Sequence, residues 1–430
     1  MTEPSSPAAG QPRPHGARSA SEAPGPPAGG PGLLSGIRVL DLTTVLAGPY
    51  AGYQLSLLGA DVVKVERPDG GDVARELGSS PDLGEIGMGA SFLAQNAGKR
   101  SVTVDLKTAG GKQVLTRLIA DADVLLENMR PRVLERLGFS WSRLREINPR
   151  LVYCALSGFG ASGPMAGRPA YDQIVQGLSG MCDVTGYPDG DPVRVGFPVC
   201  DTMGGLAAAM AVSAGLLGRE RTGEGCRLDV SMLETALTGM GWVVSDYLIA
   251  GRQPGRAGNE NATSAPSGSF RTAEGELVIA ANTDAQFQAI CESLGRPDLL
   301  TDPRFVTRED RRRHRVQLRD ELNRTLMTAP ATRWETLLAD AGVPAGRVLT
   351  VADALAQAQI QDRQLLQEVE VRGSSPRRSV RILGNGIHVN GEAPRPSAPP
   401  PALGEHTVPV LGDLGYSGEE IAALRDEGAI

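Results

Sequence analysis

Short runs of branched apolar residues recur over the first 250 residues, separated by longer stretches with helical spacing. Such runs predict β-strands, and strand, helix and strand within about 30 residues form a βαβ unit with parallel strands. The pattern therefore predicts an α/β fold with a parallel sheet. The predicted strands are residues 37–42, 61–66, 101–106, 124–127, 151–157 and 226–230, and the predicted helices are 50–58, 110–120, 131–137, 171–180 and 232–249.

An apolar run that stops at a single carboxylate continues this pattern, in VRVGFPVCDTMGG at residues 193–205. We expect a strand at 193–199, a tight turn at Asp201 and an Ala- and Leu-rich helix up to about Gly218. Asp201 then lies at the carboxyl end of a strand, where open α/β sheets bind ligands. Because Asp is also among the best helix N-cap residues, a purely capping role remains the alternative.

The character of the chain changes after residue 250. A Gly-, Asn- and Ser-rich stretch leads into a hairpin at 270–280 and several short helices, which predict a smaller α+β domain over residues 250–345. The charged run REDRRRHRVQLRDEL at 308–322 interleaves acids with bases, which is typical of a solvated helix face. Residues 346–430 supply a helix, a β run around 380–389 and a last helix at 417–427. Residues 1–32 are rich in Pro, Gly and Ala, and we expect them to be disordered.

Composition and charge exclude several classes of protein. The formal net charge of −7 argues against a nucleic-acid binder, which usually carries a basic surplus. The five cysteines are isolated and odd in number, so we expect no disulfide framework and a cytoplasmic location. The four histidines lack metal-ligand spacing, so no metal site is expected. We find neither a secretory signal nor an uninterrupted apolar run of about 18 residues, and expect no membrane association.

The usual nucleotide and hydrolase motifs are missing from the predicted turns. The first strand-to-helix turn is LAGPYAG at 46–52 instead of G-x-G-x-x-G, and neither a P-loop nor a G-x-S-x-G elbow occurs. Basic and amide side chains instead follow successive strands. Because the carboxyl ends of parallel strands meet at one edge, these side chains can share a pocket that suits phosphate groups, although each alone is typical of an ordinary surface. They are Arg67, Lys107, Asn128, Arg130 and Arg136.

Longer segments carry a resemblance to a known family. They are GIRVLDLTTVLAGPYAG from residue 36, GADVVKVERPDGGD from 59, NAGKRSVTVDLKT from 96, ADVLLENMRPRVLERLGF from 122, PAYDQIVQGLSG from 169, PVCDTMGG from 198 and GNENATSAPSGSF from 258. Found in this order between Leu33 and Ile430, they make the chain similar to the family III CoA-transferases, the family of formyl-CoA and carnitine-CoA transferases. The resemblance implies a Rossmann-like large domain built from residues 33–249 and 346–430, a smaller α+β domain between them, and an interlocked homodimer.

The resemblance also implies a site. Asp201 becomes the nucleophile: its carboxylate attacks the thioester of a donor acyl-CoA, and anhydride and aspartyl-CoA thioester intermediates pass CoA to an acceptor carboxylate. CoA and acyl-CoA are then substrates, carboxylic acids are the other partners, and no cofactor is permanently bound. The implied CoA contacts are Ala47, Arg67, Val104, Lys107, Asn128 and Arg136.

The mechanism sets further expectations for the surroundings of Asp201. A helix N-terminus after Asp201 is expected to keep the carboxylate ionised at neutral pH. Each step creates an oxyanion, for which backbone N–H groups at 47–48 and 267–268 are candidate donors. Gly204 and Gly205 are expected to leave room for CoA or for the backbone of a partner subunit.

Two other functions stay open. Racemases of the same family use a His before an Asp where this chain has Tyr171 and Asp172, and tyrosine is a far poorer base than imidazole near neutral pH. We expect Tyr171 and Asp172 at most to assist. A non-catalytic CoA-binding subunit is the other alternative, and the intact Asp201 argues against it. Two departures leave the acceptor acid open: Leu46 replaces a Gln found in some members, and the loop SAPSGSF keeps only Gly268 of a glycine run, a further candidate to assist.

Overall fold

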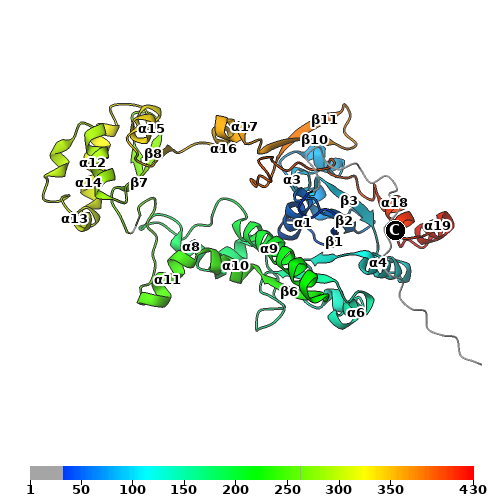
Figure 1. Cartoon of the computed structure of the whole chain (residues 1–430). Helices are drawn as coiled ribbons and strands as arrows, with labels where there is room; N and C mark the ends of the chain where they lie inside the picture. The colour runs from blue at the N-terminus through cyan, green and yellow to red at the C-terminus, as the bar shows by residue number, and fades with distance from the viewer. Residues whose placement is uncertain (1–31, 262) are drawn as a thin grey trace, which may run out of the picture.

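A six-stranded parallel sheet is the centre of the larger part of the molecule (Figure 1). The computed structural model describes residues 32–261 and 263–430. The segment 1–32, which is expected to be disordered, therefore lies outside the described residues except for Gly32. The strand order β3-β2-β1-β4-β5-β6 is that of a doubly wound dinucleotide-binding sheet, with its switch point between β1 and β4. The strands are β1 Arg38–Asp41, β2 Asp61–Glu66, β3 Lys99–Thr103, β4 Val124–Glu127, β5 Val152–Ser157 and β6 Cys226–Ser231.

Helices cover both faces of this sheet. Because successive side chains of a strand point to opposite faces, Val39 and Leu40 of β1 belong to two different cores. The first face packs on α1 (Ala47–Leu57), α7 (Asp172–Leu178), α8 (Met181–Val184), α9 (Val199–Thr222) and α10 (Met232–Gly239). The second face packs on α4 (Ala109–Asp121), α5 (Val133–Arg136), α6 (Trp141–Ile147), α18 (Thr407–Asp413) and α19 (Gly418–Asp426). This is the α/β layering that the alternating pattern predicts.

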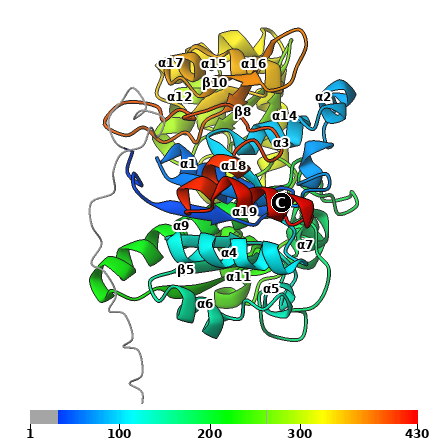
Figure 2. The same ribbon diagram turned by 90° about the vertical axis from the view of Figure 1, so that its right-hand side faces the viewer.

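The end of the chain returns to the sheet. Figure 2 shows α18 and α19 next to α4, and Leu411 and Leu424 share a core with Leu118 of α4. Upstream of them, β10 (Leu366–Val371) and β11 (Arg378–Leu383) form an antiparallel pair beside α3 (Ala90–Asn96). The hydroxyl of Tyr53 in α1 donates to the Leu383 carbonyl at 2.8 Å. The last part of the chain therefore packs on the elements formed by the first part. The loop between β2 and α3 holds η1 (Val73–Arg75) and α2 (Pro81–Glu85).

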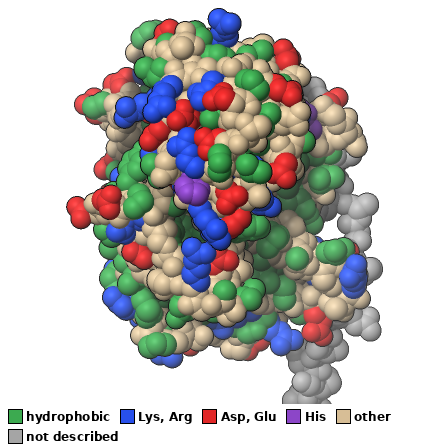
Figure 3. All heavy atoms as spheres, turned by 90° about the vertical axis from the view of Figure 1, so that its left-hand side faces the viewer, with side chains coloured by type: hydrophobic (Ala, Val, Ile, Leu, Met, Phe, Trp, Pro, Cys, Tyr) green, Lys and Arg blue, Asp and Glu red, His purple; other side chains and the backbone are tan. Residues whose placement is uncertain are grey.

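A three-stranded antiparallel sheet forms a second unit with its own core. It comprises β7 (Ser267–Arg271), β8 (Glu276–Ala280) and β9 (Ala345–Arg347), with α12 (Asp284–Ser293), η2 (Pro297–Leu300), α13 (Arg308–Arg313), α14 (Arg315–Leu326) and α15 (Ala331–Asp340). Two connections reach it in Figure 1: α11 (Gly241–Ala250) with the segments 251–261 and 263–266, and a return segment with α16 (Val351–Ala356) and α17 (Ala358–Asp362). Figure 3 views the molecule from this end, where acidic and basic side chains are intermingled.

Three sequence expectations about these elements are wrong. Residues 193–198 form no strand, because Pro198 cannot donate a ladder hydrogen bond and the backbone is tied instead to α7, with Val195 N–H donating to Gln176 Oε1 at 2.8 Å. The expected helix at 232–249 is two helices, α10 and α11, which meet at Met240. The β run expected at 380–389 is strand β11, which ends at Leu383, and its partner β10 was not expected.

Helix α9 is long and apolar enough to cross a membrane by length and composition alone. Its buried side packs on α1, α10, β5 and β6, so its apolar character has a local explanation in the core of the sheet. Core helices of soluble proteins commonly pass the same test. Its exposed side is also apolar at Leu206, Met210 and Leu217.

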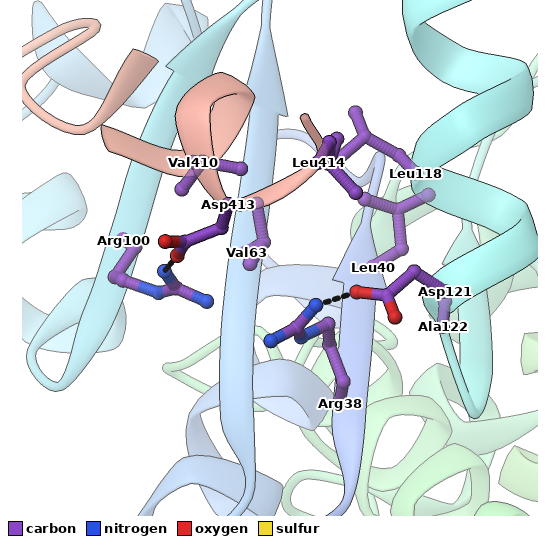
Figure 4. Close-up of a pocket in the computed structure, with 10 residues that line it drawn as sticks. All are labelled: Arg38, Leu40, Val63, Arg100, Leu118, Asp121, Ala122, Val410, Asp413 and Leu414. Atoms are coloured by element: carbon purple, nitrogen blue, oxygen red, sulfur yellow. Dashed lines mark ion pairs between the residues drawn. The ribbon is translucent and has the colours of Figure 1, made fainter. Parts of the chain in front are cut away.

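The amino edge of the sheet carries a network of ion pairs rather than a site (Figure 4). Arg38 pairs with Asp61 and Asp121, and Arg100 pairs with Asp61 and Asp413, around a cavity of about 10 Å³. Such a volume holds no more than about one water molecule. Any larger ligand must therefore bind elsewhere, and the carboxyl ends of the strands lie at the opposite end of β1.

Candidate active site

The turn between β1 and α1 is strained and held from several sides. Val45 has a φ of 70°, in the left-handed region that a β-branched residue rarely adopts. Its N–H donates to Asp72 Oδ1 at 3.0 Å. The neighbouring Thr44 exchanges two hydrogen bonds with the side-chain amide of Asn128, at 2.9 and 2.8 Å. Strain of this kind costs on the order of 1–3 kcal/mol and persists only where the surroundings impose it, most often at functional sites.

Two fully buried lysines hold the backbone of the same turn. Lys64 Nζ donates to the Thr43 carbonyl at 2.7 Å and pairs with Asp72 at 2.9 Å. Lys99 Nζ donates to the Pro49 carbonyl at 2.9 Å and pairs with Asp41 at 2.9 Å. Burial would raise the pKa of Asp72, but the Lys64 charge and two backbone N–H donors hold it below the usual value. Two buried ion pairs, Lys64–Asp72 and Lys99–Asp41, therefore hold the start of α1 in place.

The N–H groups at the start of α1 have no acceptor among the described residues. Leu46 takes the N-cap position without a side-chain oxygen to offer, and the N–H groups of Ala47 and Gly48 make no hydrogen bond within the described part of the chain. Free N–H groups at a helix N-terminus carry partial positive charge and bind anionic atoms. These are two of the donors expected for an oxyanion.

Asp201 lies in the first turn of α9 and is not its N-cap residue. The N-cap position is Pro198, which has no polar side chain, so the capping role considered for Asp201 is wrong. Asp172 of α7 supplies the missing acceptor: its Oδ1 accepts from Cys200 N–H at 2.7 Å and from Asp201 N–H at 3.3 Å. No described donor contacts the Asp201 carboxylate itself, which therefore remains available for chemistry.

The environment of Asp201 favours its protonated form more than expected. Burial, followed by the like charge of Asp172, raises its pKa to about 7. The expectation that the helix N-terminus keeps the carboxylate fully ionised at neutral pH is therefore wrong, because desolvation and a second carboxylate outweigh the helix field. A carboxylate that titrates near neutrality is partly ionised at physiological pH and is a stronger nucleophile than an ordinary one.

Gly205 brings the starts of α9 and α1 together. A side-chain Cβ at Gly205 would lie 2.5 Å from the Ala47 carbonyl oxygen and 3.0 Å from the Tyr50 ring. Gly204 faces Met232 and Leu156 in the same way. The room that these glycines leave is therefore filled by this chain's own α1 and core, which corrects the expectation of space for CoA or a partner. Asp201 lies one helical turn before Gly205, in the same first part of α9 that packs on the start of α1.

The predicted CoA contacts lie at the carboxyl ends of four neighbouring strands. Ala47 follows β1, Arg67 follows β2, Val104 and Lys107 follow β3, and Asn128 with Arg136 follow β4. Arg67, Lys107, Arg130 and Arg136 are exposed, and no ion pair within the described part of the chain involves them. The Arg67 guanidinium has one weak contact, to the Gly71 carbonyl at 3.4 Å. The edge thus carries uncompensated positive charge, as phosphate groups require.

Asn128 has a different position from the one expected of a ligand contact. Both ends of its side-chain amide are used on Thr44, across the switch point from β4 to the turn after β1. Next to it, burial raises the pKa of Glu127 to about 7, while Tyr153 and the Met129 N–H donate to its carboxyl oxygens. The Asn128 side chain therefore holds the turn between β1 and α1.

Gly268 lies in the other unit of the molecule, and Tyr171 lies at the surface. Gly268 lies in β7 of the three-stranded unit, where a Cβ would be 2.8 Å from the Asn259 carbonyl oxygen, so only glycine lets the loop fold back here. Tyr171 is the N-cap residue of α7, and its side chain is 70% exposed. Within the described residues no group of three or more His, Cys, Asp or Glu side chains could hold a metal ion.

The charged run at 308–322 is not only a solvated face. Arg311 is 2% exposed, donates to the Ala265 carbonyl at 3.3 Å and pairs with Asp284. Arg315 donates to the Asn261 carbonyl at 2.9 Å, and Arg319 pairs with Glu260 at 2.9 Å. Arg311 belongs to α13 and Arg315 and Arg319 belong to α14, so the loop is contacted from two consecutive helices. These arginines hold the loop that precedes Gly268, while Arg312 and Arg313 pair with Glu309 at the surface.

Several residues of the site were not expected from the sequence. A lysine in the middle of the apolar run DVVKVE is a signal of buried pairing that could have identified Lys64. The pairing of Asp72 with a backbone turn 27 residues away has no local signature. Gln176, fully buried between Asp172 and residues 195–197, looks in sequence like any helical glutamine.

Comparisons with known proteins agree with this geometry. The sequence profile of CoA-transferase family III matches residues 34–407. The succinate–glutarate CoA-transferase of Agrobacterium fabrum is 38% identical over 393 residues, which cover 89% of this chain and 95% of that protein. The acetyl-CoA:oxalate CoA-transferase of Acetobacter aceti is 39% identical and covers 87% of this chain and 94% of its own length.

A solved structure is similar throughout. A CAIB/BAIF family protein from Brucella suis superposes with a TM-score of 0.79 at 34% identity, over 90% of this chain and all of that one (100%). The likeness covers the sheet, the three-stranded unit and the returning C-terminal segment rather than one domain alone. The chain belongs to CoA-transferase family III and is a CoA-transferase.

Proposed function

We propose that the chain transfers CoA from an acyl-CoA donor to a carboxylic acid through covalent intermediates on Asp201. The Asp201 carboxylate attacks the thioester carbonyl, the C–S bond breaks, and a mixed anhydride and CoA thiolate form. The thiolate attacks the Asp201 carbonyl and releases the donor acid, which leaves an aspartyl-CoA thioester. The acceptor carboxylate attacks that thioester, and the thiolate released then attacks the acceptor acyl carbon of the new anhydride. Acceptor-CoA leaves and the Asp201 carboxylate is restored.

One observation carries this proposal: the half-buried Asp201 carboxylate has no hydrogen-bond partner within the described residues, and its helix packs on the start of α1 at Gly205. The N–H groups of Ala47 and Gly48 at that start are unpaired, and we propose that they face the reacting carbonyl. Every step creates negative charge on a carbonyl oxygen, which such donors stabilise. The exposed cations after β2, β3 and β4 are suited to hold the phosphates of CoA along the same edge.

The acceptor is proposed to be a short dicarboxylic acid. Relatives carry names with succinate, glutarate, oxalate and mesaconate, all of which have two carboxylates. The carboxylate that does not react needs a cation or a polar partner, and the carboxyl edge of the parallel sheet is rich in unpaired arginine. The acceptor, which the motifs alone leave open, is thereby narrowed to the dicarboxylic acids.

A racemase remains the less favoured alternative. Proton removal next to a thioester needs a positioned base, and Tyr171, which stands where racemases of this family have His, is mostly exposed. Deuterium exchange at the α-carbon of a 2-methylacyl-CoA would revive this alternative. A non-catalytic CoA-binding subunit would show tight binding of CoA without turnover of any acid.

We also propose a homodimer, interlocked as in the resemblance, and a cytoplasmic location. Apolar side chains are exposed in a stripe along α9 and on α11, where Trp242 is 82% and Ile249 86% exposed. Patches of this kind mark protein interfaces, and a second copy is the occupant proposed. The five cysteines are free, as a reducing compartment favours. Size-exclusion chromatography with light scattering tests the dimer, and a monomer would contradict it.

The transfer reaction is tested with a panel of donors and acids. Succinyl-CoA is mixed with single acids, and new CoA thioesters are measured by mass spectrometry. Asp201→Asn is expected to abolish transfer, and Asp189→Asn, on an exposed loop of the same segment, is the matched control with full activity. Transfer that persists in Asp201→Asn would refute the role of Asp201.

A further inference from the structure

The start of α9 is held by a side chain that none of the chemistry above requires. Gln176 of α7 is fully buried, and its amide makes three contacts. Its Nε2 donates to Asp172 Oδ2 at 2.6 Å and to the Phe197 carbonyl at 3.3 Å. Its Oε1 accepts from Val195 N–H at 2.8 Å. One amide thus joins α7 to the segment that leads into Asp201.

The two carboxylate oxygens of Asp172 accept hydrogen bonds from different elements, Oδ2 from α7 and Oδ1 from α9. Oδ2 accepts from Gln176, one helical turn further along α7, and this contact turns Oδ1 toward α9. Oδ1 then accepts from the N–H groups of Cys200 and Asp201. Because Pro198 offers no cap, Asp172 is the acceptor that fixes the first turn of α9. Rotation of Asp172 would release both N–H groups and the turn that carries Asp201.

We propose that Gln176 is a positioning residue for the transfer reaction: it holds Asp172 against the first turn of α9 and so sets the direction and the charge environment of the Asp201 carboxylate. The inference rests on the proposed function of Asp201. Gln176 itself touches neither Asp201 nor any substrate. Its effect passes through Asp172 and through residues 195–197.

The charge environment of Asp201 has one controlling neighbour. Tyr50 of α1 lies beside Gly205 of α9 and Cys226 of β6 beside Gly215, while Arg219 and Glu220 near the end of α9 pair with Asp123 and Arg150. Asp172 of α7 contacts the first turn, where Asp201 lies. Besides burial, only Asp172 raises the pKa of Asp201. A change that lets Asp172 move away or become neutral must therefore lower that pKa.

Two variants and a control separate these effects. Gln176→Met keeps the volume and removes all three polar contacts, so Asp172 is released. Gln176→Glu keeps the size and the acceptor for Val195, and because two carboxyl groups this close share one proton, it also keeps a hydrogen bond to Asp172. Gln173→Met, on the exposed side of the same helix, is the matched control. Should Gln176→Met not fold, Gln176→Leu, which removes the same contacts, takes its place.

The first measurement is the pH profile of transfer. The acid limb, near pH 7 in the native enzyme, is expected to move to lower pH in Gln176→Met and to stay near pH 7 in Gln176→Glu. Misplacement of Asp201 is expected to lower kcat about 10- to 100-fold in Gln176→Met, with the KM of the acyl-CoA nearly unchanged. Gln173→Met is expected to match the native enzyme in both respects. A merely structural role would lower the amount of folded enzyme and leave the pH profile in place.

The second measurement does not need turnover. A water-soluble carbodiimide labels protonated carboxyl groups, and the labelling of the peptide that contains Asp201 is followed against pH by mass spectrometry. Its midpoint is expected near pH 7 in the native protein and in Gln176→Glu, and at lower pH in Gln176→Met. Coincident midpoints in all proteins would overturn the inference. If the native protein shows no transfer at all, the proposed function fails while this titration still decides the role of Gln176.

Discussion

Removal of the Asp72 carboxylate tests how the turn between β1 and α1 is held. Asp72 accepts the N–H groups of Val45 and Ala74 at 3.0 Å each and pairs with the fully buried Lys64 at 2.9 Å. Asp72→Ala leaves that ammonium group without its carboxylate, and breaking a buried ion pair in this way costs about 3–5 kcal/mol. Urea unfolding of Asp72→Ala is expected to show a loss of this size. Asp69→Ala, on the exposed part of the same loop, is the matched control.

A second variant separates stability from function. Lys64→Met combined with Asp72→Ala removes both charges, which is often close to neutral for stability, so most of the loss is expected to return. The strained turn at Val45 nevertheless lacks two of its ties, and its relaxation is expected to lower kcat/KM for the acyl-CoA about tenfold or more, since about 1.4 kcal/mol corresponds to a factor of ten. Stability of Asp72→Ala within 1 kcal/mol of the native value, or full kcat/KM in the double variant, would refute this reasoning.

Three further predictions concern the helices around the site. Gly205→Ala places a Cβ 2.5 Å from a carbonyl of α1 and is expected to cost about 1–3 kcal/mol and most of kcat, whereas Gly218→Ala, with nothing within 4 Å, is expected to be neutral or slightly stabilising in the same assays. Asp201→Asn is expected to raise the melting temperature at pH 8 and not at pH 4: the raised folded-state pKa of about 7 destabilises the fold progressively between the unfolded pKa of Asp and pH 7, and equal shifts at both pH values would contradict this. Arg311→Met is expected to lower stability by about 1–3 kcal/mol because it leaves buried carbonyls unpaired, and Arg313→Met, at the surface, to change it by less than about 0.5 kcal/mol in the same unfolding experiment.

The parallel sheet could be predicted because its strands are short apolar runs with turn residues between them. Residues 61–66 and 124–127 match their strands to the residue, since each is buried on both faces and has no polar alternative. The strand predicted from the apolar residues at 193–199 is wrong. The conformation of this segment depends on Pro198 and on the buried amide of Gln176 in α7. The contact with Gln176 is a tertiary contact that no sequence pattern predicts.

The candidate site was predictable in its residues and less so in its electrostatics. The position of Asp201 follows from the order of motifs, but its pKa depends on how deeply the fold buries it and on Asp172, which is 29 residues earlier in the chain. The position of Asp201 at a helix N-terminus, taken alone, predicts a lowered pKa instead. The contacts of Arg311 in α13 and of Arg315 and Arg319 in α14 could not be predicted either, because interleaved charges do not reveal which side of a helix is buried.

The central claim, a covalent intermediate on Asp201, is tested most directly by mass spectrometry of the enzyme with a donor acyl-CoA and no acceptor. The account predicts a CoA adduct, formed with loss of water, on the peptide that contains Asp201, and its conversion to a hydroxamate at Asp201 by hydroxylamine. Asp201→Asn is expected to show neither product. Full transfer activity without any adduct, or an adduct on a different residue, would contradict the account.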